Sequence, residues 1–508
     1  MKRVILTFLV ILAGFLYFSF FINENEVKKA DYTNLYIDRE LQNPDAFRFY
    51  LKFRSREKGV KIRILEFEKR DVDSILIIDR DAVFISDQKL KSDLYDMESL
   101  NLSFVCIATV SPYSSEIELN ADEFNEYLGY GQEVKIRNHD VQIGFIESLS
   151  LNKRFLKVEG YYPTIKNILD GRYNGVFKAK VNFVSSRKKT LNSLIADELK
   201  YLEERSFTII AGGDIMLSRG VEVYIGKYGK DYPFRKLGDY LANSDIAFAN
   251  LECPITRSKD RFSPFKGIYF KADPENGYSL VDVGIDVLSL ANNHILDWGI
   301  TGVFDTIKYL DKVGIKWTGV GRSLKEALKP ADFTIRGTRV GFVACNNIYP
   351  THIRDEDETV VIPTLDDLLE SGVPRKLAPD YNLLVVSVHG GVEYVNKPDI
   401  LFMGKLRRLI DEGVDIVFGS HPHVIQGIEI YKERIIAYSL GNLVFDQNWS
   451  EDTSTGLLIE IGVINNRPVY FYPLIVYIDK AQPRIVRSGA YDILIPQKSR
   501  GGIYYAKK

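Results

Sequence analysis

The feature that most constrains the fold is an alternation of short apolar runs with amphipathic segments between residues 207 and 479. The apolar runs are typical of buried strands and cover Thr208–Gly212, Ile246–Ala249, Asp286–Leu290, Val340–Cys345, Leu383–Val388 and Asp415–Phe418. Amphipathic helices are predicted between some of them, at Gly302–Val313 and Ile400–Glu412. This order favours an α/β domain whose parallel or mixed sheet is covered on both faces. Three later runs predict strands of a second sheet: Arg434–Ser439, Gly456–Ile461 and Val469–Tyr477.

The chain has 508 residues, which is enough for several domains. Residues 33–188 are predicted to form a smaller α+β domain, with strand-like runs at Ser74–Ile78, Ala82–Ile85 and Phe104–Val110. A connecting helix is predicted over residues 189–205, where one helical face carries Leu191, Leu194, Ile195, Leu199 and Leu202. The main domain then covers residues 207–479, and residues 480–508 form a C-terminal tail.

The uncharged run Val4–Ile22 follows Lys2 and Arg3 and predicts a membrane anchor. A helix that spans a bilayer needs about 20 apolar residues, and flanking basic residues stay in the cytoplasm. The end of the run lacks a small-x-small cleavage site, and no cysteine follows Gly14 as a lipoprotein would require. The sequence therefore predicts a single-pass protein of the cytoplasmic membrane, with residues 4–22 as anchor and the bulk of the chain outside the cell.

Charge and cysteine content exclude two other classes of protein. The net charge is −2 and no basic stripe is visible, so no nucleic-acid partner is expected. The three cysteines, Cys106, Cys253 and Cys345, are far apart and have no CxxC spacing. They predict buried thiols and no disulfide framework.

Polar side chains follow five of the predicted strands, at the point where each strand ends. These residues are Asp214, Asn250, Glu252, Asn292, Asn293, His294, His389, His421 and His423. The chain has six histidines, and four of them are in this set. Because ligands of open α/β sheets bind at the carboxyl ends of the strands, we expect these side chains to share one edge.

Carboxylates, amides and imidazoles without cysteine suit one or two divalent ions such as Mn, Fe, Zn or Co. His421-Pro422-His423 is predicted to be extended, with both rings on the same side. Two metal ions about 3.5–4 Å apart can clamp a phosphoryl group and activate a water, with Glu252 as a bridging ligand and His294 as the acid. Asp297 either orients His294 or caps a helix. The alternative for the whole set is a structural polar network.

Six segments in this region resemble, in order, the motifs of the CapA family, the bacterial capsule and poly-γ-glutamate synthesis proteins. The segments are Gly213–Gly220, Ala249–Pro254, Ser289–Gly299, His389–Tyr394, Gly419–Gly427 and Tyr438–Asp446. The family looks like a branch of the calcineurin-like metallophosphoesterases. That resemblance implies a β-sandwich flanked by helices and a centre for divalent metal.

Carried over by position, the resemblance implies these metal ligands: Asp214, Glu252, Asn293, His389, His421 and His423. Asn293, His389 and His421 would complete one site beside the bridging Glu252, and His423 would complete the other. His294 and Asp297 would be catalytic, and Arg219, Asn250 and Lys271 would bind an anionic substrate, although for Lys271 a solvated surface position is also open. The phosphoesterases proper begin with Asp-x-His, whereas Met216 stands at the third position here, as in the CapA motif. One site therefore lacks a ligand.

Two functions from different classes fit these observations. The first is a metal-dependent hydrolase in the synthesis or export of a capsular polyanion, acting on a phosphoester or on a poly-γ-glutamate-like amide polymer. The second is a non-catalytic subunit that tethers the polymer beside polymer synthase subunits, with a structural or vestigial metal site. A third reading, a solute receptor, rests on Tyr161–Tyr173, which is similar to a stretch of phosphate-type periplasmic binding proteins. Residues 33–188 would then be a degenerate binding-protein lobe; the alternative is an unrelated α+β domain.

Overall fold

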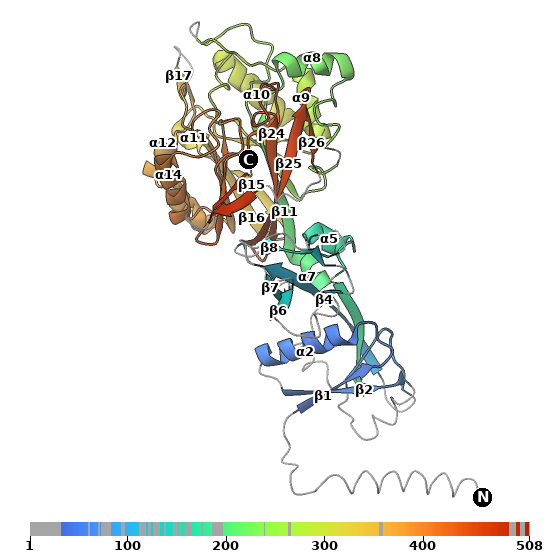
Figure 1. Ribbon diagram of the computed structural model, residues 1–508. Coiled ribbons are helices and arrows are strands. Elements are labelled where there is room, and N and C mark those ends of the chain that lie inside the picture. Colours follow the sequence, from blue (N-terminus) through green and yellow to red (C-terminus); the bar gives the residue numbers. More distant parts are fainter. Residues whose placement is uncertain are drawn as a thin grey trace, which may run out of the picture. The chain divides into compact units, whose positions relative to one another are not determined.

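The computed structural model describes most of the chain after residue 31 (Figure 1). The described residues are 32–58, 61–69, 72, 83–92, 97–110, 118–119, 123–124, 133–136, 139–145, 151, 154–158, 162, 164–174, 176–184, 197–237, 239–262, 266–354, 359–486, 494–497 and 503–506. The anchor predicted at residues 4–22 lies outside this part. Within it, no helix has both the length and the apolar character needed to cross a membrane.

The chain separates into two compact units. One contains Met1–Phe104 and Phe177–Asp197, and the other contains Val105–Val176 and Glu198–Lys508. Residues 105–176 therefore belong to the same unit as the predicted main domain.

The first unit packs helix α2 (Pro44–Lys58) beside strands β1 (Tyr32–Asp38), β2 (Lys61–Phe67), β3 (Val83–Ser86) and β10 (Val176–Val184). Strand β1 pairs in parallel with β2 and β3, and β10 is antiparallel to β3. Its core is aromatic, since the rings of Tyr50 and Phe104 stack at 4.3 Å. The predicted run Ala82–Ile85 is confirmed as β3, whereas Ser74–Ile78 lies outside the described residues.

Strand β4 (Met97–Val110) confirms the predicted run Phe104–Val110. Its second half pairs antiparallel with β7 (His139–Phe145) and β8 (Arg154–Phe155). The same stretch of chain holds β5 (Glu118–Leu119), β6 (Glu133–Ile136), β9 (Lys157–Val158) and α5 (Ile165–Leu169). Helix α5 is tied to the rest of its unit because the Ile165 N–H donates to the Tyr470 hydroxyl at 3.0 Å.

Two mixed sheets form the main part of the second unit. The first has the order β14-β13-β12-β11-β24-β25-β26, and β23 also pairs with β11. Strands β11 to β14 run in parallel, and the last three are antiparallel. Their bounds are Ser206–Ile215 (β11), Ile246–Leu251 (β12), Val287–Ser289 (β13), Lys316–Thr318 (β14), Asn442–Val444 (β23), Thr455–Ile464 (β24), Arg467–Asp479 (β25) and Gln482–Ile485 (β26).

The second sheet has the order β15-β16-β19-β20-β22-β21-β28-β27. Strands β16, β19, β20 and β22 are parallel, and the outer ones are antiparallel. Their bounds are Ala331–Ile335 (β15), Thr338–Asn346 (β16), Leu383–His389 (β19), Ile416–Ser420 (β20), Ile428–Tyr431 (β21), Arg434–Ala437 (β22), Leu494–Gln497 (β27) and Ile503–Ala506 (β28). A separate hairpin pairs β17 (His352–Arg354) with β18 (Thr359–Val361).

The structure corrects one expectation about these sheets. All three late runs are strands, but only the run from Arg434 joins the second sheet, as β22. The other two, β24 and β25, form a hairpin that extends the first sheet along β11. The apolar pattern identifies a strand, but the backbone edge that it pairs with is set by the tertiary structure.

The two sheets pack face to face, with helices on the outer faces. Phe248 of β12 stacks on Phe342 of β16 and Phe418 of β20, at centroid distances of 5.8 and 5.3 Å. Because side chains alternate along a strand, the neighbouring Ala247 faces outward, into the core beneath the helices of the first sheet. The predicted strands and helices of this domain are thus confirmed as a mixed α/β fold.

The helices divide between the two outer faces, as Figure 1 shows. Helices α8 (Arg219–Tyr228), α9 (Pro274–Asp282) and α10 (Gly299–Val313) pack on the first sheet. Helices α12 (Leu365–Glu370) and α14 (Ile400–Asp411) pack on the second, with α13 (Val373–Leu377) and α11 (Leu324–Ala327) beside them. The predicted connecting helix is described over Glu198–Arg205 as α7, which leads into β11, and a 3₁₀ turn covers Ala378–Asp380.

Phe248→Ala should lower the free energy of unfolding by about 3–5 kcal/mol, because it leaves a cavity between the two sheets. Urea unfolding followed by circular dichroism at fixed metal concentration would measure the change. The control is Val223→Ala, at a side chain that is 69% exposed, with an expected effect below about 0.5 kcal/mol. Equal stability of the two variants would contradict the face-to-face packing.

Candidate metal centre

The carboxyl ends of parallel strands from both sheets bring the predicted residues to one edge. In the first sheet, Asp214 of β11 is in register with Asn250 of β12, and Glu252 follows directly. In the second, His389 ends β19 in register with Ser420, the last residue of β20. The loops after β13 and β20 add the remaining members, Asn293, His294, His421 and His423. The predicted convergence at one edge is therefore what the structure shows.

Glu252 lies at the centre of the cluster and is fully buried. In the described part of the chain, neither of its carboxylate oxygens has a hydrogen-bond partner. Its Oε1 lies 3.7 Å from His389 Nε2, 3.8 Å from His423 Nε2 and 4.0 Å from His294 Nε2. A buried carboxylate without donors is costly, and a bound cation removes that cost. The donor set thus fits a divalent metal ion.

Two groups of candidate ligands share Glu252. One is Asp214, Glu252 and His423, and the other is Glu252, His389 and His421; within each, the ligand atoms lie within 4.8 Å of one another. Asn293 joins the second group, because its Oδ1 is 2.8 Å from His389 Nε2. This is the arrangement expected for two neighbouring ions bridged by one carboxylate.

Asp214 is held in place by two donors. The Asn250 side-chain amide donates to Oδ1 at 2.8 Å, and the His421 N–H donates to Oδ2 at 3.2 Å. Asn250 therefore orients a candidate ligand, although the sequence predicts it as a substrate contact. Asn292 supports the same loop, since its Nδ2 donates to the Leu251 carbonyl at 2.8 Å.

The extended conformation predicted for His421-Pro422-His423 is wrong. His421 has φ 96° and His423 has φ 57°, both in the left-handed region. The turn arises because the backbone of His421 donates to Asp214 and the ring of His423 reaches Asn442, with Nδ1 3.0 Å from Oδ1. Such conformations cost about 1–3 kcal/mol each and persist where surrounding contacts hold them.

The cluster perturbs the pKa values of its members in opposite directions. Burial and the neighbouring Asp214 raise the pKa of Glu252 well above its usual range. Burial lowers the pKa of His423, but Glu252 and Asp214 outweigh it and raise the pKa to about 9. Burial and neighbouring imidazoles lower the pKa of His421 to about 4 and that of His389 well below its usual range. The raised pKa values of Glu252 and His423 both favour bound protons in the metal-free cluster.

His294 is oriented by Asp297, and the helix-cap alternative for Asp297 is wrong. His294 Nδ1 lies 2.8 Å from Asp297 Oδ2, which also accepts from the Phe270 N–H at 2.7 Å. Helix α10 has Trp298 as its N-cap residue, without a side-chain cap bond. The Phe270 ring stacks on His294 at 3.9 Å, and burial lowers the pKa of His294. The imidazole is thus fixed in position with Nε2 toward Glu252.

Lys266 is a site residue that no sequence signal singles out. It forms an ion pair with Asp297 and donates to the Asn293 carbonyl at 2.7 Å. Lys266 lies in a loop that has no periodic pattern of apolar residues and does not directly follow a predicted strand. Only the tertiary structure therefore brings Lys266 close to His294. Asn442, which holds the His423 ring, is a second residue that the sequence analysis missed. Unlike Lys266, it falls inside one of the six family-like segments, Tyr438–Asp446, so that segment could have indicated it.

The other two predicted substrate residues lie in different surroundings. Arg219 pairs with Asp446, and its guanidinium lies 4.8 Å from the Phe270 ring that stacks on His294. Lys271 places its ammonium 3.9 Å from the Trp298 ring and donates to the Ser258 carbonyl at 3.1 Å. Arg219 is therefore close to the centre, whereas no described contact joins Lys271 to it.

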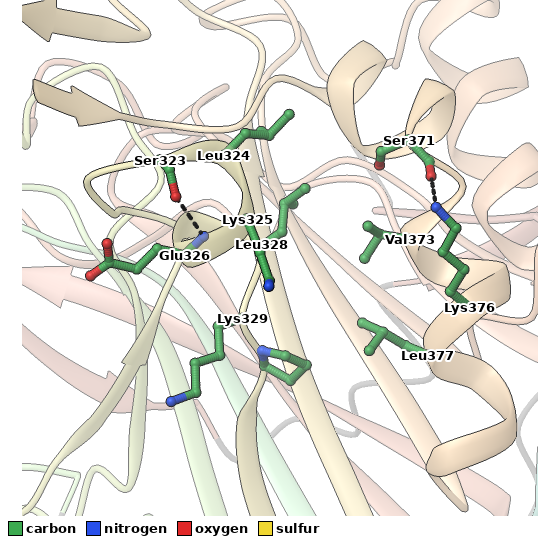
Figure 2. Close-up of a pocket in the computed structure, with 11 residues that line it drawn as sticks. Ser323, Leu324, Lys325, Glu326, Leu328, Lys329, Ser371, Val373, Lys376 and Leu377 are labelled. Carbon is green, nitrogen blue, oxygen red and sulfur yellow. Dashed lines mark hydrogen bonds between the residues drawn. The ribbon is translucent and has the colours of Figure 1, made fainter.

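A separate cavity of about 640 Å³ lies between α11 and α13 (Figure 2). Leu324 and Leu328 line one side, and Val373 and Leu377 line the other. None of its lining residues belongs to the histidine and carboxylate cluster. The candidate site is therefore the cluster and not this cavity.

Fold and site together define a mixed α/β protein with a candidate metal centre at the strand ends. Residues 208–447 match the family model described as "Bacterial capsule synthesis protein PGA_cap". The chain is 31% identical over 320 residues to "Capsule biosynthesis protein CapA" of Bacillus anthracis, covering 61% of this chain and 78% of that protein. It is 30% identical over 276 residues to "PGA biosynthesis protein CapA" of Bacillus subtilis (strain 168), covering 54% and 72%.

The chain therefore belongs to the CapA family of bacterial capsule synthesis proteins, which confirms the resemblance found in its motifs. Among solved structures, it is similar to a 5'-nucleotidase precursor from Thermus thermophilus. That similarity has a TM-score of 0.33 and 16% identity, and it covers 55% of this chain and 56% of the other.

Metal binding should weaken as the pH falls from 8 to 6. In this range the metal-free protein keeps a proton on His423, whose pKa is about 9, and the pKa of Glu252 is also raised. A cation must displace the His423 proton, so we expect release of about one proton and a roughly tenfold loss of affinity per pH unit. Titration calorimetry with Mn²⁺ in buffers of different ionisation enthalpy would measure this release. A pH-independent affinity would contradict the assigned ligands.

Proposed function

We propose that this protein is a membrane-anchored, extracytoplasmic CapA-type protein that acts in the synthesis or export of a poly-γ-glutamate-like capsular polyanion. We also propose that its strand-end cluster is the centre of a metal-dependent hydrolase of the metallophosphoesterase type. The observation that carries the second proposal is Glu252, a fully buried carboxylate without hydrogen-bond donors among the described residues and with three imidazoles within 4.0 Å.

Asp214, Glu252 and His423 would hold one divalent ion, and Glu252, Asn293, His389 and His421 would hold the other. When bound, such ions polarise the scissile group and lower the pKa of a water to make a nucleophile. The protein supplies the dry surroundings and the fixed ligand positions. Asn250, Ser420 and Asn442 keep the ligand side chains in place through hydrogen bonds.

His294 would donate the proton to the leaving group. This step uses the imidazolium form, in which both ring nitrogens carry hydrogen: Nε2, directed toward the cluster, gives its proton, and Nδ1 keeps the hydrogen that faces Asp297. Burial opposes this charged form, and the Asp297 carboxylate favours it. Lys266 forms an ion pair with the same carboxylate and holds it in place beside His294. Arg219, near the Phe270 ring, supplies a positive charge for an anionic substrate.

The second candidate is the non-catalytic tethering subunit, and Met216 is the observation in its favour. Met216 is fully buried, and its sulfur accepts the Ser218 N–H at 3.1 Å. It therefore offers no ligand where the phosphoesterases have a histidine. Bound metal without any turnover that depends on His294 would favour this role.

His294→Ala should lower kcat for a generic phosphodiester, bis(p-nitrophenyl) phosphate, by about 10²- to 10⁴-fold with bound metal unchanged. Asp297→Asn should lower kcat less, because it keeps the ring in place but removes the carboxylate that favours the imidazolium form. Elemental analysis and initial rates would be measured on the same samples. The matched control is His352→Ala, an exposed histidine of β17 that should retain wild-type rates. Equal rates for the two histidine variants would remove His294 from the mechanism.

The anchor proposal rests on the uncharged run at residues 4–22. Deletion of this run should move the protein from the membrane pellet to the supernatant after ultracentrifugation, because the apolar segment that binds the bilayer is lost. The full chain should resist extraction by alkaline carbonate and should be degraded by protease added to spheroplasts. Full-length protein in the supernatant, or protection from external protease, would contradict the proposal.

A further inference from the structure

The metal centre has one more carboxylate beside it that none of the predicted roles uses. We propose that Glu393, in the loop after β19, is a metal ligand that takes the place left by Met216. This inference rests on the proposed metal centre and adds a residue to it.

The deficit lies in the site that contains Asp214 and His423. With Glu252 these residues offer three ligands. Met216 stands two positions after Asp214, where the phosphoesterases have a histidine, and its sulfur already accepts a hydrogen bond from the Ser218 N–H. The other site has four ligands from protein side chains: Glu252, Asn293, His389 and His421. The two sites are thus unequal unless another side chain contributes.

Glu393 lies beside His423, a candidate ligand of the deficient site. Its carboxylate forms a third group with His421 and His423, and one ligand atom from each lies within 4.8 Å of the others. Glu393 is exposed, whereas both histidines are buried, so it approaches the cluster from the solvent side. His421 Nδ1 is a buried atom without a hydrogen-bond partner in the described chain, so the part of the cluster next to Glu393 contains a polar atom that a bound ion could satisfy.

The loop that carries Glu393 is fastened to the histidine segment on both sides of it. Before it, the Gly390 N–H donates to the Ser420 carbonyl at 2.9 Å, and after it the Tyr394 N–H donates to the Pro422 carbonyl at 2.8 Å. Gln426 then donates to the Val395 carbonyl at 2.8 Å. Tyr394 has φ 61°, a strained conformation for tyrosine that these contacts maintain. These hydrogen bonds to the loop backbone hold Glu393 near the cluster.

A carboxylate in place of a histidine changes the chemistry of that site. Asp214, Glu252 and Glu393 would supply oxygen and His423 would supply nitrogen, whereas the second site has two oxygen and two nitrogen donors. Oxygen-rich sites suit Mn²⁺ better than softer ions. We therefore expect the Glu393 site to prefer Mn²⁺ over Zn²⁺ relative to its neighbour.

The test is Mn²⁺ binding to the purified full-length chain after dialysis against a chelator, measured by titration calorimetry and elemental analysis. Wild type should bind two ions, and Glu393→Gln and Glu393→Ala should weaken one of them at least tenfold. The control is Glu451→Gln, an exposed carboxylate outside the cluster, which should bind as wild type does. Adding Met216→His to Glu393→Gln should restore the second ion, because it returns the missing ligand.

Two results separate this inference from the proposed function. If wild type binds Mn²⁺ and neither Glu393 variant changes the number of ions or their affinity, the role of Glu393 is wrong and the metal centre stands. If wild type binds no divalent ion, the metal centre itself fails, and Glu393 with it. Circular dichroism would confirm that each variant is folded, and the two Glu393 variants decide the question even if Met216→His does not fold.

Discussion

The negative charge buried around Glu252 is the constraint on which the rest of this structure depends. Two carboxylates, Asp214 and Glu252, lie fully buried at the meeting point of two sheets, and the second of them has no donor in the described chain. The surrounding imidazoles can balance this negative charge only when they are protonated, and Glu252 and Asp214 raise the pKa of His423 for that reason. A divalent cation balances the same negative charge without bound protons, which is why the site suits a metal ion.

Neither sheet could build this centre alone. Asp214, Glu252 and Asn293 come from strand ends of the first sheet. The three imidazole ligands come from the second sheet, where His389 ends β19 and His421 and His423 lie in the loop after β20. The stacking of Phe248 on Phe342 and Phe418 holds the two sheets at a fixed separation and so fixes the distances between the two ligand sets. Any ion bound by both sets would stabilise the folded sandwich, because the unfolded chain cannot assemble them.

The loops that complete the centre carry backbone strain, and that strain is concentrated on one side. His421, His423 and Tyr394 all have positive φ, and all three lie in two neighbouring segments that backbone hydrogen bonds join beside the cluster. Hydrogen bonds between these segments maintain the strain. They hold imidazole, phenol and carboxylate side chains in directions that a relaxed extended loop would not give. The aromatic residues around them, Phe270, Phe445 and Tyr394, keep the histidine rings packed.

The sequence by itself determined the strands, the helices that cover them and the set of side chains at the strand ends, because periodicity and the order of elements are local properties of the chain. It also determined the family, since six motifs occur in order. Only the tertiary structure decided that β24 and β25 extend the first sheet, that Asp297 faces His294, and that Lys266 and Glu393 stand beside the cluster. Those facts depend on backbone pairing and loop paths between residues far apart in the chain, which no local pattern encodes.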